Sequence, residues 1–533
     1  MSSSTVNPRP RLSTLAGHVG LSAKGMLLVA GILAMLMRPA LIDPDYYWHV
    51  EAGRWIVMHG ALPVADPFSF TARYPWVTHE WLFEIFLYGV FAAGGSFAVK
   101  LMSALLGAAA VVLVYATVNK VIRRPTLAAW LAVAFYVFMY QFPSPRPQLF
   151  TYVFLATVFY VLVALKYEKD VRLLPALPLL MIVWVNAHGG YLIGVLLMGA
   201  FCATEWLVQR ASPADERDRR HLRRLALTFG MVVLASLCNP LFVGLWLHPF
   251  QIMGMQATRQ IAEWWSPDFH SVLGRLYLLM VGGFCALQIY RTRKPDLTEI
   301  AIPGLFIVAA LTSNRHIPLA AMAMTVFAAP AVRDGLQIAG FVPAGIGRAW
   351  QTWRARAGSG KSLGYTEGLL NLAVALILVA AAAAYYPTAR DGEAVAVRAA
   401  LPVDAVRFIL DNRIEGRPFN SYDYGGYLIH ALYPQQRVFI DGRTDVYGDQ
   451  FFADYFIIAA GAPDWAPLFD GYAIDYVVCQ RDAPIRQLLL LRGDFRLVFD
   501  NRTSSVLVRD IPRFAAIPTV DGAQIATPPQ VSP

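Results

Sequence analysis

The chain has 533 residues, of which 57% are hydrophobic and only 15% are charged, and its mean hydropathy is +0.46. This composition excludes an ordinary soluble protein, because apolar runs of bilayer-crossing length recur through residues 22–386. The net charge of +9 does not indicate a nucleic-acid partner, since the basic residues form short clusters between the apolar runs. The sequence therefore predicts a polytopic α-helical membrane protein.

The predicted elements begin with a short segment at residues 1–21, expected on the cytoplasmic side, and continue with a transmembrane domain over residues 22–386. About eleven runs in this domain are close to the ~20 residues that cross a ~30 Å hydrocarbon core. They are 22–42, 98–119, 126–142, 148–165, 173–187, 190–208, 222–241, 272–290, 297–313, 316–332 and 366–386.

The apolar segment 81–95 can be placed in two ways. As a further span it would move Lys120, Arg123 and Arg124 to the outer side and invert every later loop. As a helix at the outer interface it leaves the basic loops on the cytoplasmic side, in agreement with the lysine and arginine bias that orients membrane proteins. We therefore expect an interfacial helix, and we expect the chain after residue 386 on the outer side.

Residues 387–511 differ in composition, with short β-branched and aromatic runs that alternate with helical patterns. The expected strands are RPFNSY, RVFID, DYVVC, FRLVF and SSVLVR, and the expected helices are 402–413, 425–433, 449–460 and 482–492. These elements suffice for one small core, so we predict an extracytoplasmic α/β domain. Residues 512–533 lack periodicity and are rich in Pro, Ala and Thr, so a disordered tail is expected.

Polar residues concentrate at the outer ends of the predicted helices. The first group is the outer loop 43–97, in which acidic residues and histidines alternate with aromatic residues, and we interpret it as the reactive loop. Ionisable groups near a membrane are costly and are kept where they pair or act, so we expect several outer loops to converge on one polar cavity. The later segments are Pro145-Arg146-Pro147-Gln148, Asn186-Ala187-His188-Gly189-Gly190, Glu263-Trp264-Trp265 and Asn314-Arg315-His316.

Such a cavity has the groups that sugar transfer from a lipid phosphate needs. A carboxylate can act as general base towards a hydroxyl, and an arginine can stabilise a departing phosphate. Tryptophan and tyrosine faces can stack on sugar rings or line a lipid groove.

The order of these elements resembles the GT-C superfamily of polyprenyl-phosphate-sugar glycosyltransferases, above all the branch of protein O-mannosyltransferases and lipid A aminoarabinose transferases. The acidic motif after the first helix is similar to Asp45-Tyr46-Tyr47-Trp48-His49, although Tyr46 stands where the family commonly has a glutamate. Asp43 lies two positions upstream, so either aspartate could be the base. The segment 96–105 also resembles the start of the family's second helix. DPFSF, HEW, NAHGG, EWWSP, GGYL and VFIDGRTD resemble segments of a bacterial group of GT-C proteins.

The resemblance implies an inverting transfer from a polyprenyl-phosphate sugar to an extracytoplasmic glycan, lipid or protein. The enzyme would lie in a bacterial inner membrane, with its N-terminus cytoplasmic and its C-terminal domain periplasmic. Asp45 would be the general base, with Asp43 as the alternative or as an orienting partner. Arg315 would bind the donor phosphate, with Arg146 as the second candidate. The sugar or acceptor ligands would be His49, His79, Glu80, Asn186, His188, Glu263 and His316.

The resemblance requires no cofactor. Some members of the superfamily use a divalent metal, and the oxygen ligands that such an ion prefers could come from Asp43, Asp45, Glu80 and Glu263.

Structural alternatives accompany these assignments. Asp43-Pro44-Asp45 could be a capping turn at a helix end, His188 could belong to a tight turn, and Arg315 could extend to the membrane interface. Three other functions also stay open: a polysaccharide ligase with a polyprenyl-diphosphate donor, a non-catalytic assembly protein of envelope polysaccharide, and a lipid-linked-sugar transporter. A transporter would show broken helices with polar residues near mid-membrane, whereas here these residues concentrate at one side.

Overall fold

A computed structural model of the chain describes residues 31, 43–140, 144–213, 215, 217–256, 261–335 and 365–520. The predicted N-terminal segment 1–21 and, except for residue 31, the first predicted span 22–42 lie outside the described residues.

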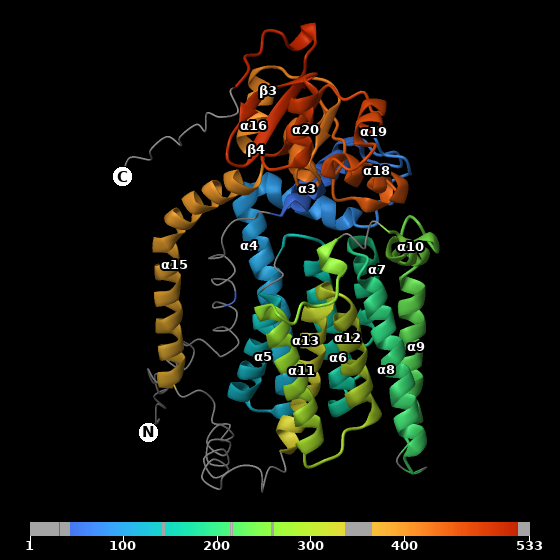
Figure 1. Ribbon diagram of the computed structural model, residues 1–533. Coiled ribbons are helices and arrows are strands. Elements are labelled where there is room, and N and C mark those ends of the chain that lie inside the picture. Colours follow the sequence, from blue (N-terminus) through green and yellow to red (C-terminus); the bar gives the residue numbers. More distant parts are fainter. Residues whose placement is uncertain are drawn as a thin grey trace, which may run out of the picture.

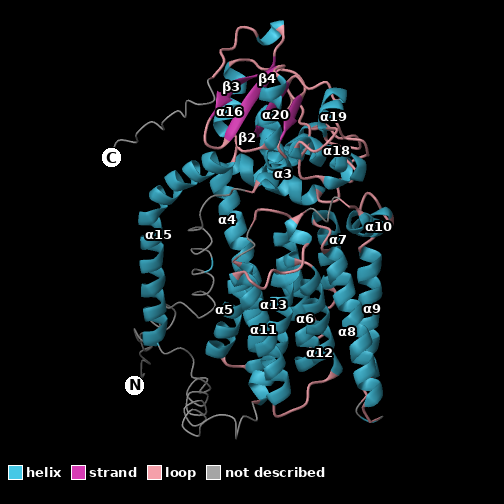
Figure 2. Cartoon of the chain, viewed as in Figure 1, coloured by secondary structure: helices cyan, strands magenta, loops and turns pink. Residues whose placement is uncertain are grey.

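Helices dominate the described chain, and the strands gather in a smaller body over one end of a helical bundle (Figures 1 and 2). A long helix, α15 (Tyr365–Ala400), runs beside the bundle and returns the chain to the smaller body (Figure 1). The bundle contains α4 (Trp81–Ile122), α5 (Pro125–Met139), α6 (Gln148–Glu168), α7 (Ala176–Ala187), α8 (Tyr191–Ala211), α9 (Arg219–Ala235), α10 (Gly244–Gly254), α11 (Val272–Tyr290), α12 (Leu297–Thr312) and α13 (Ile317–Asp334).

Five helical runs are long and apolar enough to cross a membrane, which supports the predicted membrane location. They are Trp81–Ile122, Gln148–Glu168, Tyr191–Ala211, Val272–Tyr290 and Asn314–Asp334. Four further predicted spans overlap the shorter helices α5, α7, α9 and α12, and the span predicted at 366–386 lies within α15. The total of eleven spans therefore stays a prediction.

Helix α4 contains both the segment expected at the interface and the second predicted span. The backbone leaves helical geometry at Gly94 (φ −163°, ψ 23°) and at Gly95 (φ 60°, ψ −153°). A positive φ is accessible to glycine at little cost, so Gly95 permits a sharp bend here. Residues 81–93 are therefore a separate helical unit, as an interfacial helix would need to be.

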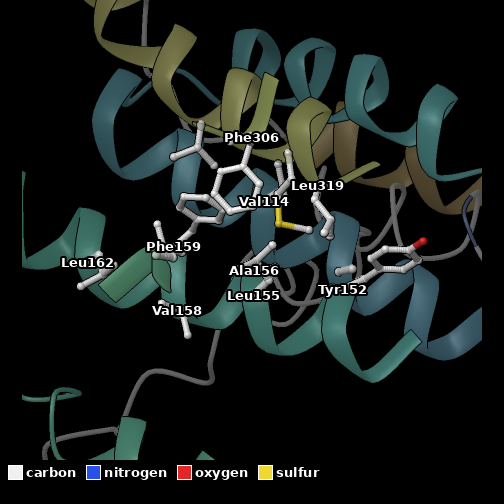
Figure 3. Close-up of a cluster of buried hydrophobic side chains, with 14 of the residues drawn as sticks. Val114, Tyr152, Leu155, Ala156, Val158, Phe159, Leu162, Phe306 and Leu319 are labelled. Carbon is white, nitrogen blue, oxygen red and sulfur yellow. The ribbon is translucent and has the colours of Figure 1, made fainter. Parts of the chain in front are cut away.

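The bundle core lies where α4, α6, α12 and α13 meet, and Figure 3 shows its side chains. Leu155 and Phe159 on α6 are fully buried, and they pack in one cluster with Val114 of α4, Phe306 of α12 and Leu319 of α13. The rings of Phe159 and Phe306 are 5.8 Å apart. Because a close-packed interior resists deformation, this core fixes the helix ends that carry the polar loops.

Ion pairs cross-link the bundle at the end far from the smaller body. The charged groups are mostly buried, and they join the ends of α6, α8, α11, α12 and α13. A buried ion pair is costly to break, because removing either partner leaves the other charge buried and uncompensated. The pairs are Lys166 with Glu205 and Asp296, and Arg291 with Glu299 and Asp334.

The smaller body contains a four-stranded sheet of order β1-β2-β4-β3, in which β1 is parallel to β2 and the other neighbours are antiparallel. The strands are β1 (Pro418–Asn420), β2 (Tyr476–Gln480), β3 (Phe495–Asp500) and β4 (Ser504–Arg509). The four predicted helices are present as α16 (Val403–Asp411), α17 (Gly425–Leu432), α18 (Asp449–Ala460) and α20 (Pro484–Arg492), and α19 (Trp465–Gly471) is additional.

The expected strand RVFID is wrong. The backbone N–H of Val438 donates to Phe68 at 2.9 Å, and its carbonyl accepts from the N–H of Phe70 at 3.3 Å. These bonds form one isolated parallel bridge, between Ser69 and Val438. The segment therefore pairs with the outer loop and does not join the sheet.

The expected disordered tail begins too early. Phe514 is 2% exposed and Ile517 is 7% exposed, and the N–H of Val520 donates to the carbonyl of Leu497 on β3 at 2.9 Å. Residues 512–520 thus pack against the sheet, because their apolar side chains complete its core. Residues 521–533 lie outside the described part of the chain.

The outer loop shares a hydrophobic core with the C-terminal part of the chain. The loop begins with α3 (Pro44–His59), and its Trp48, Phe68 and Trp76 lie in the same buried cluster as Phe439 and Val477. We refer to residues 43–80 and 403–520 together as the head. The head is thus one packed unit built from two segments that are more than 300 residues apart in sequence.

Arg443 fixes the two segments of the head to each other. Its guanidinium donates to Asp441 at 2.7 and 2.8 Å and pairs with Asp66 of the outer loop. It also lies over the ring of Trp76, 4.6 Å from the centroid. The three charged side chains are at most 1% exposed, so the pairing is a buried and specific link.

Candidate active site

Helix α3 begins at the first candidate motif. Asp43 is its N-cap and accepts the backbone N–H of Asp45 at 3.0 Å, while Pro44 occupies the first turn, where a missing N–H is tolerated. The capping alternative is therefore correct for Asp43, at the start of a helix. Both carboxylates lie at the positive end of the helix dipole, which favours negative charge.

Arg146, just before α6, joins three carboxylates. Its Nε and Nη2 atoms donate to the two oxygens of Asp43 at 2.5 and 2.8 Å. Nη2 lies 3.0 Å from Asp45, and Nη1 lies 3.2 Å from Glu263. We refer to these four residues as the carboxylate cluster. Their side chains are 15–46% exposed, so the cluster is partly open to solvent.

The two aspartates use their oxygens differently. Asp43 accepts two bonds from Arg146, one from the hydroxyl of Ser144 and one from the N–H of Asp45. Asp45 accepts a bond from Trp48 Nε1 at 3.1 Å and pairs with Arg146. A carboxylate has about four lone-pair sites, so Asp43 is saturated and Asp45 keeps capacity for a further partner.

The surroundings separate the pKa values of these two groups. Burial raises the pKa of Asp45, and the charge of Asp43 adds to this effect while Arg146 opposes it. Burial would also raise the pKa of Asp43, but the charge of Arg146 and the hydrogen bonds from Arg146 and Ser144 lower it overall. Asp45 is therefore the more basic of the pair, and paired groups with separated pKa values are typical of acid–base sites.

Three histidines surround Glu80, the residue before α4. The Nε2 atoms of His79, His188 and His49 lie 3.4, 3.7 and 3.9 Å from the oxygens of Glu80. We refer to these four residues as the imidazole cluster. His49 follows Asp45 by one helical turn on α3, so this helix connects the imidazole cluster with the carboxylate cluster.

Fixed hydrogen bonds set the protonation of two of these rings. His188 Nδ1 accepts the N–H of Gly190 at 3.1 Å, so its proton lies on Nε2, and burial lowers its pKa to about 4. His79 Nδ1 donates to the carbonyl of Val77 at 3.0 Å. Burial would lower the pKa of His79, but Glu80 outweighs it and raises the pKa to about 9. At neutral pH, His188 is neutral and His79 is a cation beside Glu80.

Arg315 lies in the short helix η4 (Asn314–His316), beside η3 (Ala262–Trp264). Its guanidinium lies over the ring of Trp264, 4.6 Å from the centroid. Within the described ranges, no carboxylate forms an ion pair with Arg315. Glu263, next to Trp264, contacts Arg146, so η3 connects this arginine to the carboxylate cluster.

Two predicted ligands belong to neither cluster. The side-chain amide of Asn186 donates to two backbone carbonyls at 2.8 Å, and its oxygen accepts a bond from the indole of Trp81 at 2.9 Å. Asn186 therefore cross-links helix ends, with both of its N–H donors and one lone pair of its oxygen used within the protein. His316 follows Arg315, and its Nδ1 lies 3.3 Å from the carbonyl of Ala309.

The C-terminal segment of the head also reaches the carboxylate cluster, which sequence analysis missed. A Cβ atom at Gly442 would lie 2.0 Å from Asp45 Oδ1, and one at Gly426 would lie 2.0 Å from the carbonyl of Pro44. Tyr422 lies nearby, and burial raises its pKa, with the charge of Asp45 adding to the effect. The motifs GGYL and VFIDGRTD drew attention to this segment in the sequence, but they did not indicate that it contacts Pro44 and Asp45.

The carboxylate cluster does not fit a divalent metal in this arrangement. Such an ion needs oxygen ligands at about 2.0–2.6 Å, and the guanidinium of Arg146 occupies the space between the three carboxylates. Among the residues that the structure describes, no group of three or more His, Cys, Asp or Glu side chains is placed to hold an ion. We therefore assign no step to a metal.

The described chain thus combines an apolar helical bundle with a head that encloses acidic residues at the helix ends. The archaeal oligosaccharyltransferase AglB from Archaeoglobus fulgidus, solved with an inhibitory peptide and a dolichol-phosphate, has a similar fold. It aligns with a TM-score of 0.54 at 14% identity, over 86% of this chain and 69% of that chain. Its apo form gives a TM-score of 0.54 at 14% identity, over 86% and 70%.

At this identity the likeness establishes the fold, and it confirms the GT-C fold predicted from the sequence. ArnT from Cupriavidus metallidurans, bound to undecaprenyl phosphate, aligns over 94% of this chain and 98% of that chain at 14% identity, with a lower TM-score of 0.48. No protein-family model and no curated protein sequence matches the chain.

Proposed function

We propose that the protein is a membrane glycosyltransferase that moves a sugar from a polyprenyl-phosphate donor to an extracytoplasmic glycan, lipid or protein, with inversion. One observation carries this proposal. Asp45, a carboxylate with a raised pKa, lies in the same site as Arg315, an arginine that has no carboxylate partner among the described residues. Arg146 and helix η3 connect the two, because Arg146 pairs with both Asp45 and Glu263, and Trp264 lies under the guanidinium of Arg315. The oligosaccharyltransferase with a similar fold has a lipid phosphate in its solved complex.

In this proposal Asp45 removes the proton of the acceptor hydroxyl as that oxygen bonds to the anomeric carbon of the donor sugar. The bond between the anomeric carbon and the phosphate oxygen breaks on the opposite face, which inverts the configuration. The electron pair leaves with the phosphate, and Arg315 stabilises the negative charge that develops there.

Asp43 and Arg146 hold Asp45 in place. Asp43 has no lone pair left for a substrate, so we assign it to orienting Arg146. Arg146 is the weaker candidate for the donor phosphate, because three carboxylates already neutralise it.

The remaining candidates are sugar or acceptor ligands. The imidazole cluster and Glu263 lie beside the base, and His316 lies beside Arg315. We leave Asn186 out of this set, because both of its N–H donors bond to backbone carbonyls and its oxygen already accepts the indole N–H of Trp81.

We place the protein in a bacterial inner membrane, with the N-terminus cytoplasmic and the head on the periplasmic side. The support is the excess of lysine and arginine in loops at the bundle end far from the head, as in Lys120, Arg123 and Arg124. A periplasmic site would have access to lipid-linked sugar donors and to envelope acceptors.

The far end of the bundle argues against the transporter alternative. Alternating access needs one bundle to rock against another around a central site. Here the buried ion-pair network includes Lys166, near the far end of α6. Lys166 is 20 residues after Arg146, which corresponds to about 30 Å at 1.5 Å per helical residue. This network holds the far ends of the helices together and opposes such a motion.

The test is sugar release by the purified protein from a panel of polyprenyl-phosphate sugars, with and without an envelope extract as acceptor. Asp45→Asn is expected to lower transfer by about 10²–10⁴-fold and to leave donor binding unchanged, because it removes only the base. Arg315→Ala is expected to weaken donor binding. Arg275→Ala is the matched control, because this exposed arginine bonds only to nearby backbone carbonyls.

The outcomes separate the alternatives. If polyprenyl-diphosphate donors are consumed and monophosphate donors are not, the protein is a ligase. If neither donor binds, the transferase proposal fails and the assembly protein takes its place.

A further inference from the structure

The carboxylate of Asp45 lies close to the backbone of the C-terminal segment at Gly442, with Oδ1 nearest. A Cβ built on Gly442 would be 2.0 Å from Oδ1, 2.8 Å from Cγ and 3.1 Å from Oδ2 of Asp45. No side chain other than hydrogen fits in this space. The second contact point is Gly426, whose Cβ would lie 2.0 Å from the carbonyl of Pro44, directly before Asp45.

Space, and not backbone conformation, requires glycine at position 442. Gly442 is not among the residues with positive φ, so an L-residue could adopt its backbone conformation. Movement of the backbone is opposed by the neighbours on both sides, because Asp441 and Arg443 pair with each other and Arg443 also pairs with the buried Asp66. The group that would have to move is therefore the carboxylate of Asp45.

We propose that Gly442 is a positioning residue for Asp45, so that the C-terminal segment of the head completes the catalytic site. This inference rests on the proposed role of Asp45 as the base. The carboxylate is then held on three sides: by the indole of Trp48, by Arg146 and by the backbone at position 442. The acceptor must reach it past the C-terminal segment, which includes Tyr422, whose pKa is raised by burial and by the charge of Asp45.

The size of the effect follows from the geometry. Real Cβ contacts do not fall below 3.0 Å, so the alanine of Gly442→Ala would displace Asp45 Oδ1 by at least about 1 Å. That shift is incompatible with the present bonds to Trp48 and Arg146, at 3.1 and 3.0 Å. A 1 Å misplacement of a catalytic group costs about 100-fold in rate.

Three glycine variants test the proposal in the full-length protein. Gly442→Ala is expected to lower the kcat of sugar transfer about 100-fold with little change in donor KM, and to shift the acidic limb of the pH profile. Gly426→Ala disturbs the packing of the C-terminal segment on α3 at the carbonyl of Pro44, and its Cβ does not meet the carboxylate of Asp45. It is expected to lower the melting temperature and to have a much smaller effect on kcat than Gly442→Ala. Gly471→Ala, where a Cβ meets nothing within 4 Å, is expected to match the wild type.

A stability cycle tests the contact without any activity. Gly442→Ala is expected to lower the melting temperature of the wild type but to have much less effect in an Asp45→Ala background, because the clash is then absent. Equal effects in both backgrounds would overturn the inference, as would equal losses of kcat and stability in Gly442→Ala and Gly426→Ala. If the two substitutions are coupled in melting temperature but the wild type transfers no sugar, the contact between Gly442 and Asp45 is supported and the proposed function is refuted.

Discussion

Replacing Arg443 should release the C-terminal segment of the head from the outer loop. The guanidinium is 1% exposed and is paired with Asp66 and Asp441, which are equally buried. Removing one partner of a buried ion pair costs about 3–5 kcal/mol. Asp441 would keep the hydroxyl of Tyr447 at 2.6 Å and Asp66 would keep the N–H of Ser69 at 2.8 Å, so we expect Arg443→Met to cost about 3 kcal/mol.

Pulse proteolysis of the head in a urea series measures this free energy in the detergent-solubilised protein. The control is Arg513→Met, which removes an exposed pair with Asp475 and should cost about 0–1 kcal/mol. Making the site neutral with Arg443→Met, Asp66→Asn and Asp441→Asn together should recover much of the loss, because no buried charge is then uncompensated. A stability of Arg443→Met equal to that of its control, or a triple variant no more stable than the single one, would refute this role of Arg443.

Three further predictions concern the site. EDTA is expected to leave the melting temperature unchanged, and added Mn²⁺ is expected to give no signal of bound ion in electron paramagnetic resonance, because Arg146 fills the carboxylate cluster. A signal of bound Mn²⁺ that disappears in Asp45→Asn would contradict this prediction. Thermal stability should fall between pH 6.5 and about 9, because the pKa of His79 is raised to about 9 on folding and its stabilising charge is lost as pH rises through that value; His79→Gln should flatten this part of the curve. Asn186→Ala should cost roughly 1–3 kcal/mol and lower the melting temperature of the helical bundle, since it leaves polar partners unsatisfied. A loss of donor binding at unchanged melting temperature would return Asn186 to the ligand set.

The helices of the bundle could be predicted from the sequence because their signal is local. Each apolar run has a length and a periodicity that can be counted without knowing its neighbours, and the bend at Gly94 and Gly95 falls where the interfacial segment was expected to end. The strand expected at RVFID failed for the opposite reason. Its β-branched residues are suited to a strand, but its backbone partners are Phe68 and Phe70, about 370 residues away.

The site was predicted as a set of residues, but not as a set of contacts. Asp43, Arg146 and Glu263 were all candidates, yet their mutual ion pairs depend on how α3, α6 and η3 are placed by the bundle core. Gly442 was visible only as part of the VFIDGRTD motif, because a glycine required for close approach has the same appearance in sequence as any turn glycine. The different roles assigned to Asp43 and Asp45 depend on the number of hydrogen bonds to each carboxylate oxygen, which follows only from the three-dimensional structure.

The shared core of the head also sets the order in which the protein can mature. Phe68 and Trp76 leave the ribosome early, but their apolar partners, such as Phe439 and Val477, are made more than 350 residues later. Until then the outer loop exposes aromatic surface, as incompletely assembled folding intermediates do. Such contacts between distant parts of a chain are slow to form, so closure of the head is the expected last step of biogenesis. A nascent chain therefore keeps the aromatic surface of the outer loop exposed until residues 403–520 have docked, and interrupted synthesis leaves that surface accessible to proteases.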